Sequence, residues 1–162
     1  MIVRTNELGK TQKITISAMV MALYVVIMYF TQSFAFGEYQ IRIATALYSL
    51  SCLLPFLVLP LGMSNLISNM VMGGMGLPDI LGGFAVGIVT AGLCWLIGKY
   101  NMKPWLVAIP IILVPGLGVA IWLSAILGIP YFVMAGQLLL GQIVPGILGA
   151  VITTTMKGRL FQ

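Results

Sequence analysis

ITISAMVMALYVVIMYFTQSF, residues 14–34, is an apolar run without a charged residue, and it is long enough to cross a bilayer as one helix. The rest of the chain has the same character, because 60% of its 162 residues are hydrophobic and only 7% are charged. Soluble domains carry about 25% charged residues. Since so few charged side chains cannot cover the surface of a soluble fold, the composition predicts an integral membrane protein. It argues against a DNA-binding domain, a secreted disulfide scaffold and a soluble enzyme.

Five further apolar runs follow, and polar or turn-rich segments separate each predicted helix from the next. We place the break between the second and third helices at Pro60-Leu61-Gly62. With residues 1–13 and 157–162 as short cytoplasmic tails, the whole chain 1–162 is expected to form a single membrane domain, a six-helix bundle at residues 14–156. The predicted fold is therefore an all-α integral membrane protein with six transmembrane helices, at residues 14–34, 43–59, 63–72, 80–97, 105–127 and 131–156.

The positions of Lys and Arg predict the orientation in the membrane. Six spans place both termini on one side, where all the basic residues except Arg42 collect: Arg4, Lys10, Lys13, Lys99, Lys103, Lys157 and Arg159. Because cytoplasmic segments carry the excess of basic residues, we expect a multi-pass membrane protein with both termini in the cytoplasm. A cleaved signal peptide is the alternative interpretation of the first run, although that run is long and lacks a convincing cleavage site.

The scarce polar residues gather toward the opposite, outer face. Such groups are costly in lipid, so we expect them to point inward, toward one another or toward a ligand. Two alternatives stay open: Glu38 and Arg42 form a plain loop ion pair, or Asn65 and Asn69, on one side of the third helix, only join helices. The substrate-binding candidates are Glu38, Gln40 and Arg42 in the first outer loop, Asn69 on the third helix, Asp79 at the second outer loop, and Gln137 in the sixth helix.

The residue types at this face suit a planar ligand with polar edges. A carboxylate such as Glu38 or Asp79 accepts two adjacent N–H groups of a guanine-like edge, and an amide or Arg42 donates to a ring oxygen. A flat heterocycle also favours aromatic surfaces, which Phe36, Tyr39, Phe84, Trp122 and Tyr131 supply. This chemistry does not single out a deazapurine over tryptophan, a flavin or another vitamin.

Other chemistries have no residues to support them. The chain has no histidine, Cys52 and Cys94 are far apart, and no Asp or Glu lies inside a predicted span. The segment 92–99 approaches a phosphate-binding loop, but its glycines are one residue too far apart. We therefore predict no catalytic residue, no metal, no cofactor and no nucleic-acid partner. The chain is interpreted as a membrane-embedded binding subunit, not an enzyme, that depends on other subunits for energy.

Two stretches carry a family resemblance. Residues 36–47, FGEYQIRIATAL, and 74–83, GMGLPDILGG, together with Pro55, Gly62 and Asn69, resemble the QueT-type proteins, which are substrate-binding S components of energy-coupling factor (ECF) transporters. The resemblance spans residues 14–156. It implies a six-helix S-component bundle in a bacterial cell membrane that binds a queuosine precursor, a 7-deazaguanine-like heterocycle, at the outer face.

The resemblance also implies partners and a mechanism. Ala18 and Ala22 match the Ala-x-x-x-Ala surface with which S components dock on a transmembrane coupling (T) subunit, and two cytoplasmic ATPase subunits supply the energy. The loaded S component is expected to topple in the membrane and deliver its substrate inward. From the residues alone, the small side chains at 18 and 22, like those at Gly83 and Gly87, also suit close packing between helices.

Two departures from the family pattern concern the substrate. Thr45 and Gln137 stand where acids are expected, and an aminomethyl deazaguanine is a cation that favours nearby carboxylates. A neutral relative of that ligand, or an S component for an unrelated vitamin or amino acid, is therefore the alternative. An alternative of another class is a small membrane structural or assembly protein without a ligand.

Overall fold

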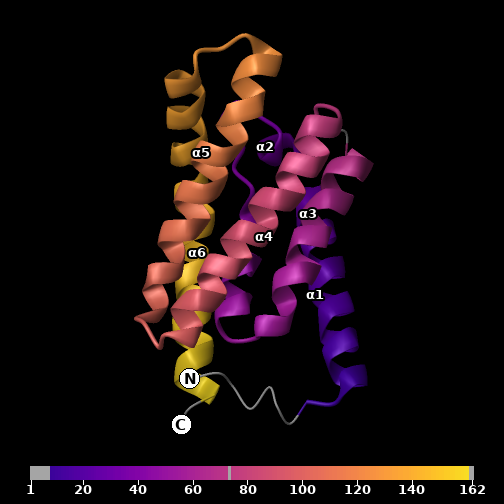
Figure 1. The fold of residues 1–162 in the computed structure, drawn as a ribbon, viewed down its shortest axis with the longest axis vertical. Coiled ribbons are helices and arrows are strands. Elements are labelled where there is room, and N and C mark those ends of the chain that lie inside the picture. Colours follow the sequence, from indigo (N-terminus) through magenta and orange to yellow (C-terminus); the bar gives the residue numbers. More distant parts are fainter. Residues whose placement is uncertain (1–7, 73, 161–162) are drawn as a thin grey trace.

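All regular elements of the described part of the chain are helices (Figure 1). The computed structural model describes residues 8–72 and 74–160, with side chains as far as residue 158. In order, with η for a 3₁₀ helix, the elements are α1 (Lys10–Phe30), α2 (Gln32–Ala35), η1 (Ile43–Cys52), η2 (Pro55–Leu57), α3 (Val58–Met72), α4 (Leu77–Lys99), η3 (Pro104–Val107), α5 (Ala108–Leu127) and α6 (Tyr131–Leu160).

The predicted break at Pro60-Leu61-Gly62 is wrong, because these residues lie inside α3 and the chain turns earlier, at η2. Pro55 disfavours the helical conformation for the residue before it, and Leu54 has φ −126° and ψ 84°. Pro60 is tolerated because it stands in the first turn of α3, where backbone N–H groups have no acceptor within the helix. The second predicted helix is therefore shorter than expected and the third is longer.

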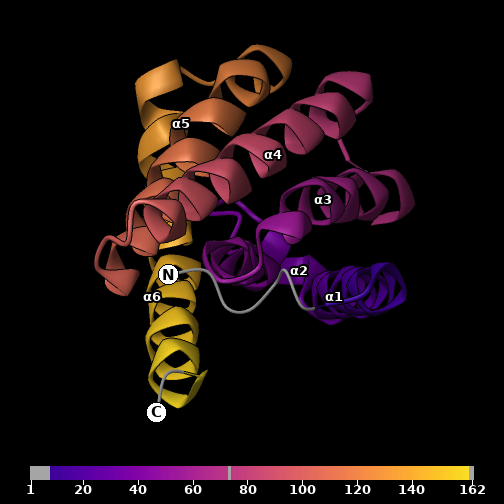
Figure 2. The same ribbon diagram turned by 60° about the horizontal axis from the view of Figure 1, so that its bottom comes forward.

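Five helical segments surround one short central helix. By length and composition, five segments are able to cross a membrane: 10–30, 55–72, 77–99, 104–127 and 131–158. The helix η1 differs from them, since a 3₁₀ helix of ten residues rises about 20 Å against a hydrocarbon core of about 30 Å. It packs against α1, α3, α4, α5 and α6, and eight of its residues are buried (Figure 2). The result is a multi-pass membrane bundle whose shortest element is shielded by its neighbours.

Charge separates along the bundle. The start of α1, the α4–α5 connection and the end of α6 lie at one end, here called the basic end (Figure 1). The α3–α4 and α5–α6 connections lie at the other end, here called the acidic end because Asp79 opens α4 there. Arg4 lies outside the described residues, as does the side chain of Arg159. The cytoplasmic location of the basic end remains a prediction from the sequence.

Glycines allow the closest helix contacts. A Cβ on Gly83 would lie 2.5 Å from Asn69 Nδ2, and one on Gly87 would lie 3.1 Å from the Cα of Gly62. Asn69 and Gly62 belong to α3, so the small-residue face of α4 serves internal packing, as predicted.

Candidate functional site

A cavity of about 250 Å³ lies at the acidic end, between the segment that follows α2 and the α5–α6 hairpin. Its polar lining comes from Glu38, Gln40 and Gln137. The remaining lining is mainly apolar: Phe36, Gly37, Met75, Leu123, Leu127, Ile129 and Met134. Ligand pockets for drug-sized molecules measure about 300–1,000 Å³, so this cavity suits a smaller ligand. A mostly apolar wall with a few polar groups is typical of a site for a small heterocycle.

The loop that carries Gln40 is held tightly against α6. Gln40 has a φ of 44°, in the left-handed region that few residues other than glycine adopt. Its carbonyl accepts a hydrogen bond of 3.1 Å from Gln142 Nε2, and the Thr45 hydroxyl donates to Gln142 Oε1 at 3.0 Å. The neighbouring carbonyl of Tyr39 lies directly against Gly141, where a Cβ would overlap it. The polar side of the cavity is thus positioned by α6.

Arg42 is almost fully buried, with 3% of its surface exposed. Its Nη1 donates to Asn65 Oδ1 at 3.2 Å, whereas Nε and Nη2 have no hydrogen-bond partner. The loop ion pair between Glu38 and Arg42 is therefore not formed. Instead, Arg42 Cζ lies 5.0 Å from the centroid of the Phe36 ring, within the range of a cation–π contact.

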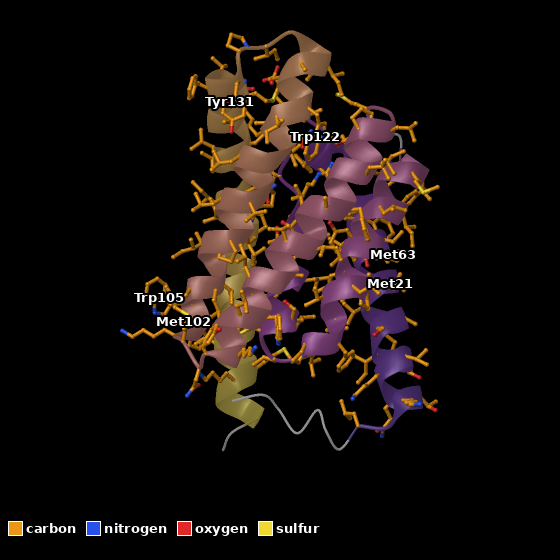
Figure 3. The ribbon with its side chains drawn as sticks, viewed as in Figure 1. Met21, Met63, Met102, Trp105, Trp122 and Tyr131 are labelled. Carbon is orange, nitrogen blue, oxygen red and sulfur yellow. The ribbon has the colours of Figure 1, made fainter. Side chains whose placement is uncertain are left out.

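Asp79 and Asn69 form a second buried group beside the cavity. Asp79 Oδ1 accepts from Trp122 Nε1 at 3.0 Å, and Oδ2 accepts from the backbone N–H of Met75 at 3.1 Å. Trp122 lies at the same end of the bundle as Tyr131 (Figure 3). Asn69 Nδ2 donates to the backbone carbonyl of Asp79 at 2.9 Å, while its Oδ1 has no partner. The carboxylate therefore fixes the start of α4 against α5.

The structure divides the six sequence-predicted residues into two sets. Glu38, Gln40 and Gln137 line the cavity, whereas Arg42, Asn69 and Asp79 are buried next to it. Two cavity-lining residues contact the buried set: the Phe36 ring lies against Arg42, and the backbone N–H of Met75 donates to Asp79. Of the five aromatic residues considered from the sequence, Phe36 belongs to this lining.

The sequence did not reveal the buried hydrogen-bond chain that leads from Arg42 to α1. Asn65 accepts from Arg42 and donates to the Tyr48 hydroxyl at 2.9 Å, and that hydroxyl lies 3.2 Å from the hydroxyl of Tyr24. Asn65 thus joins helices. This was one of the two interpretations of the residue from the sequence, the other being contact with a ligand. The apolar cavity wall was missed as well, since Leu and Met in an apolar run carry no distinguishing signal. The signal in the sequence that would have revealed the hydrogen-bond chain is a tyrosine in the middle of an apolar run, because its buried hydroxyl needs a partner.

Ala18 and Ala22 are exposed on α1, so they do not pack against the rest of the bundle. Of the residues in α1, Tyr24 and Met28 are fully buried. This helix therefore presents a broad surface outward.

Among residues 8–72 and 74–160 there is no group of three or more His, Cys, Asp or Glu side chains able to hold a metal ion. Cys52 and Cys94 are both buried and unpaired.

A family model described as QueT transporter matches residues 14–158. No match was found among curated proteins or among solved structures. The matched segment includes every candidate residue described above, and its limits agree with those of the resemblance in the sequence.

Proposed function

This chain belongs to the QueT transporter family, and on that basis we propose that it captures a queuosine precursor, a 7-deazaguanine-like heterocycle, in the cavity at the acidic end. It is a membrane-embedded substrate-binding component of a transporter, not an enzyme. The observation that carries the proposal is the cavity with Glu38, Gln40 and Gln137 on its wall, next to a buried arginine with unused donors.

The proposed contacts follow from the chemistry of the base. Two adjacent N–H donors of a guanine-like edge match the carboxylate of Glu38, and the amides of Gln40 and Gln137 offer both donors and acceptors. The ring oxygen requires a donor. When the ligand displaces the Phe36 ring, Nε and Nη2 of Arg42 become available to that oxygen, while Asp79 and Asn69 hold the neighbouring helix ends.

The neutral Gln137 favours a neutral member of this ligand class. Thr45, the other residue that stands where an acid is expected, is buried and already bonded to the Arg42 carbonyl and to Gln142. The presence of Thr45 in place of an acid therefore does not alter the charge of the cavity wall. Gln137, by contrast, lines the cavity, so it bears directly on the charge of the ligand. The same observation favours the second candidate, an S component for another small vitamin or amino acid.

The ligand is tested by thermal unfolding of the purified chain with a panel of deazaguanine precursors, queuine, tryptophan and common vitamins. A ligand that binds only the folded state raises the midpoint, by about 5–11 °C at a concentration of a hundred times Kd. We expect a deazaguanine to give the largest shift and the neutral members to exceed the aminomethyl cation. A shift with an unrelated vitamin alone would contradict the queuosine assignment and support the second candidate.

Transport requires partners that supply energy. No phosphate-binding loop was found in the sequence, and the two acids of the described segments, Glu38 and Asp79, belong to the acidic end rather than to an ion pathway across the bundle. We therefore propose an ECF T subunit and two cytoplasmic ATPase subunits as partners. In this mechanism α1 docks through Ala18 and Ala22 on the T subunit, and the loaded chain topples to present its cavity to the cytoplasm.

The double variant Ala18→Trp/Ala22→Trp is expected to reduce uptake by the complete transporter to below about a tenth while ligand affinity stays within about twofold. Large side chains prevent close approach of two helices, but both positions are exposed in this chain and far from the cavity lining. Uptake and ligand binding are measured in parallel. Ile121→Trp, at an exposed position on α5, serves as the control, and normal uptake by the double variant would contradict the docking assignment.

A further inference from the structure

A second hollow lies at the basic end, far from the candidate site. This groove, of about 460 Å³, runs between the last two turns of α4 and the first two turns of α5; it is called here the α4–α5 groove. Its lining comes from both helices and their connection, including Leu96, Tyr100, Met102, Ile109 and Leu113. Met102 lies beside Trp105 at this end of the bundle (Figure 3).

The lining offers almost no hydrogen-bonding side chain. Apart from the Tyr100 hydroxyl, every lining side chain is apolar, and Met102, Ile109 and Leu113 are between 44% and 47% exposed. A hydrocarbon chain makes no hydrogen bonds, so it can fill such a surface without leaving a polar group unpaired. The groove is therefore chemically suited to an acyl chain.

Basic and aromatic residues border the groove. Lys99 ends α4, and its Nζ lies 5.1 Å from the ring centroid of Trp95 and 5.9 Å from that of Tyr100. Lys103 is exposed in the connection, and Trp105 is 54% exposed beside it. Tryptophan and tyrosine concentrate at the level of lipid headgroups, so these residues mark the depth of the membrane interface.

The positive charge at this border is not neutralised by acidic residues of the described segments. Glu38, in the cavity lining, and Asp79, in the first turn of α4, belong to the opposite end of the bundle. The apolar groove and the basic border are also continuous, since Tyr100 lines the groove and lies under Lys99. A ligand that fills both regions needs a hydrocarbon tail and a negative headgroup.

We propose that the α4–α5 groove binds one anionic phospholipid, with an acyl chain in the groove and its phosphate beside Lys99 and Lys103. Basic sites between transmembrane helices recognise anionic headgroups, and each lysine near the membrane surface adds to the attraction. A zwitterionic lipid fills the groove equally well but gains less from the two lysines. The site is therefore selective for headgroup charge, which distinguishes it from ordinary lipid contact.

Native mass spectrometry of the full chain tests this proposal. The protein is exchanged into mixtures of phosphatidylglycerol and phosphatidylcholine with identical acyl chains. We expect one phosphatidylglycerol to be retained with a preference of about tenfold or more. The double variant Lys99→Gln/Lys103→Gln should lose this preference, whereas the matched control Lys10→Gln/Lys13→Gln, which removes two lysines at the start of α1, should keep it.

A second pair of variants tests the groove without changing charge. Leu113→Trp fills the groove and should reduce retention of both lipids, whereas Leu117→Trp, one turn further along α5 and outside the lining, should not. Equal retention of the two lipids, or equal effects of the two lysine pairs, would overturn the proposal. An adduct with the mass of a second chain in place of lipid, or a Leu113→Trp variant that retains its lipid, would overturn it as well.

Discussion

The variant Gly141→Ala is expected to abolish ligand binding and to lower the stability of the protein. A Cβ at this position would overlap the carbonyl of Tyr39, which is backbone and cannot rotate away. Extra atoms in a well-packed region cost about 1–3 kcal/mol, and more when backbone must move. The shift would displace Gln40, whose carbonyl binds Gln142 and whose side chain lines the cavity. Thermal unfolding and ligand-induced shifts measure both effects.

The matched control for this variant is Gly136→Ala on the same helix. A Cβ there has nothing within 4 Å, so the substitution should be neutral or stabilising by about 0.5–1 kcal/mol, the ordinary gain of alanine over glycine in a helix. If Gly141→Ala unfolds and binds ligand like Gly136→Ala, the contact between Tyr39 and α6 is not needed for the site.

The variant Arg42→Met is expected to reduce ligand affinity by at least about 100-fold without loss of stability. Each charge-assisted hydrogen bond to a ligand is worth about 1.5–3 kcal/mol, and Arg42 has two unused nitrogens. In the ligand-free protein these two nitrogens are buried without partners, so removing them relieves a desolvation cost. The loss of the Nη1 donor opposes this gain, because it leaves Asn65 Oδ1 buried without its partner at a cost of about 1–3 kcal/mol. We expect the two effects to nearly cancel, so the midpoint of the ligand-free variant should stay level.

Arg42→Lys separates charge from geometry. Lysine keeps the positive charge but lacks the planar fork of donors, so it should also bind weakly if Nε and Nη2 contact the ligand. Full affinity in Arg42→Met would remove this residue from the binding site. A large loss of stability in the same variant would instead assign Arg42 a structural role through Asn65 and the Tyr48–Tyr24 pair.

The sequence predicted some parts of the fold because local rules decide them. Apolar runs of sufficient length mark α4, α5 and α6, and the spacing of Asn65 and Asn69 places both on the buried side of α3. The break at Pro60 was wrong, since a proline stops a helix only beyond its first turn. Nothing in the local pattern showed that η1 would be a short, central 3₁₀ helix, because that depends on the five helices around it.

The candidate site was predictable in its residue types but not in its arrangement. Spacing left a Glu38–Arg42 ion pair open as one alternative, yet the chain turns at Gln40 with a positive φ and the pair is not formed. The carboxylate faces the cavity, while the guanidinium meets Asn65 on α3. This separation comes from contacts between residues far apart in the chain, such as Gln40 with Gln142.

By itself the sequence determined the membrane class, the apolar runs and the end of the bundle at which polar residues gather, because each of these depends on composition and spacing along one segment. The family match over residues 14–158 rests on the sequence as well. Only the tertiary structure decided that Glu38, Gln40 and Gln137 share a cavity. It also decided that Arg42 is buried against the Phe36 ring, with two nitrogens that have no hydrogen-bond partner. Burial and hydrogen-bond satisfaction are properties of packed neighbours, and the pairs that decide them here lie as far apart in the chain as Gln40 and Gln142.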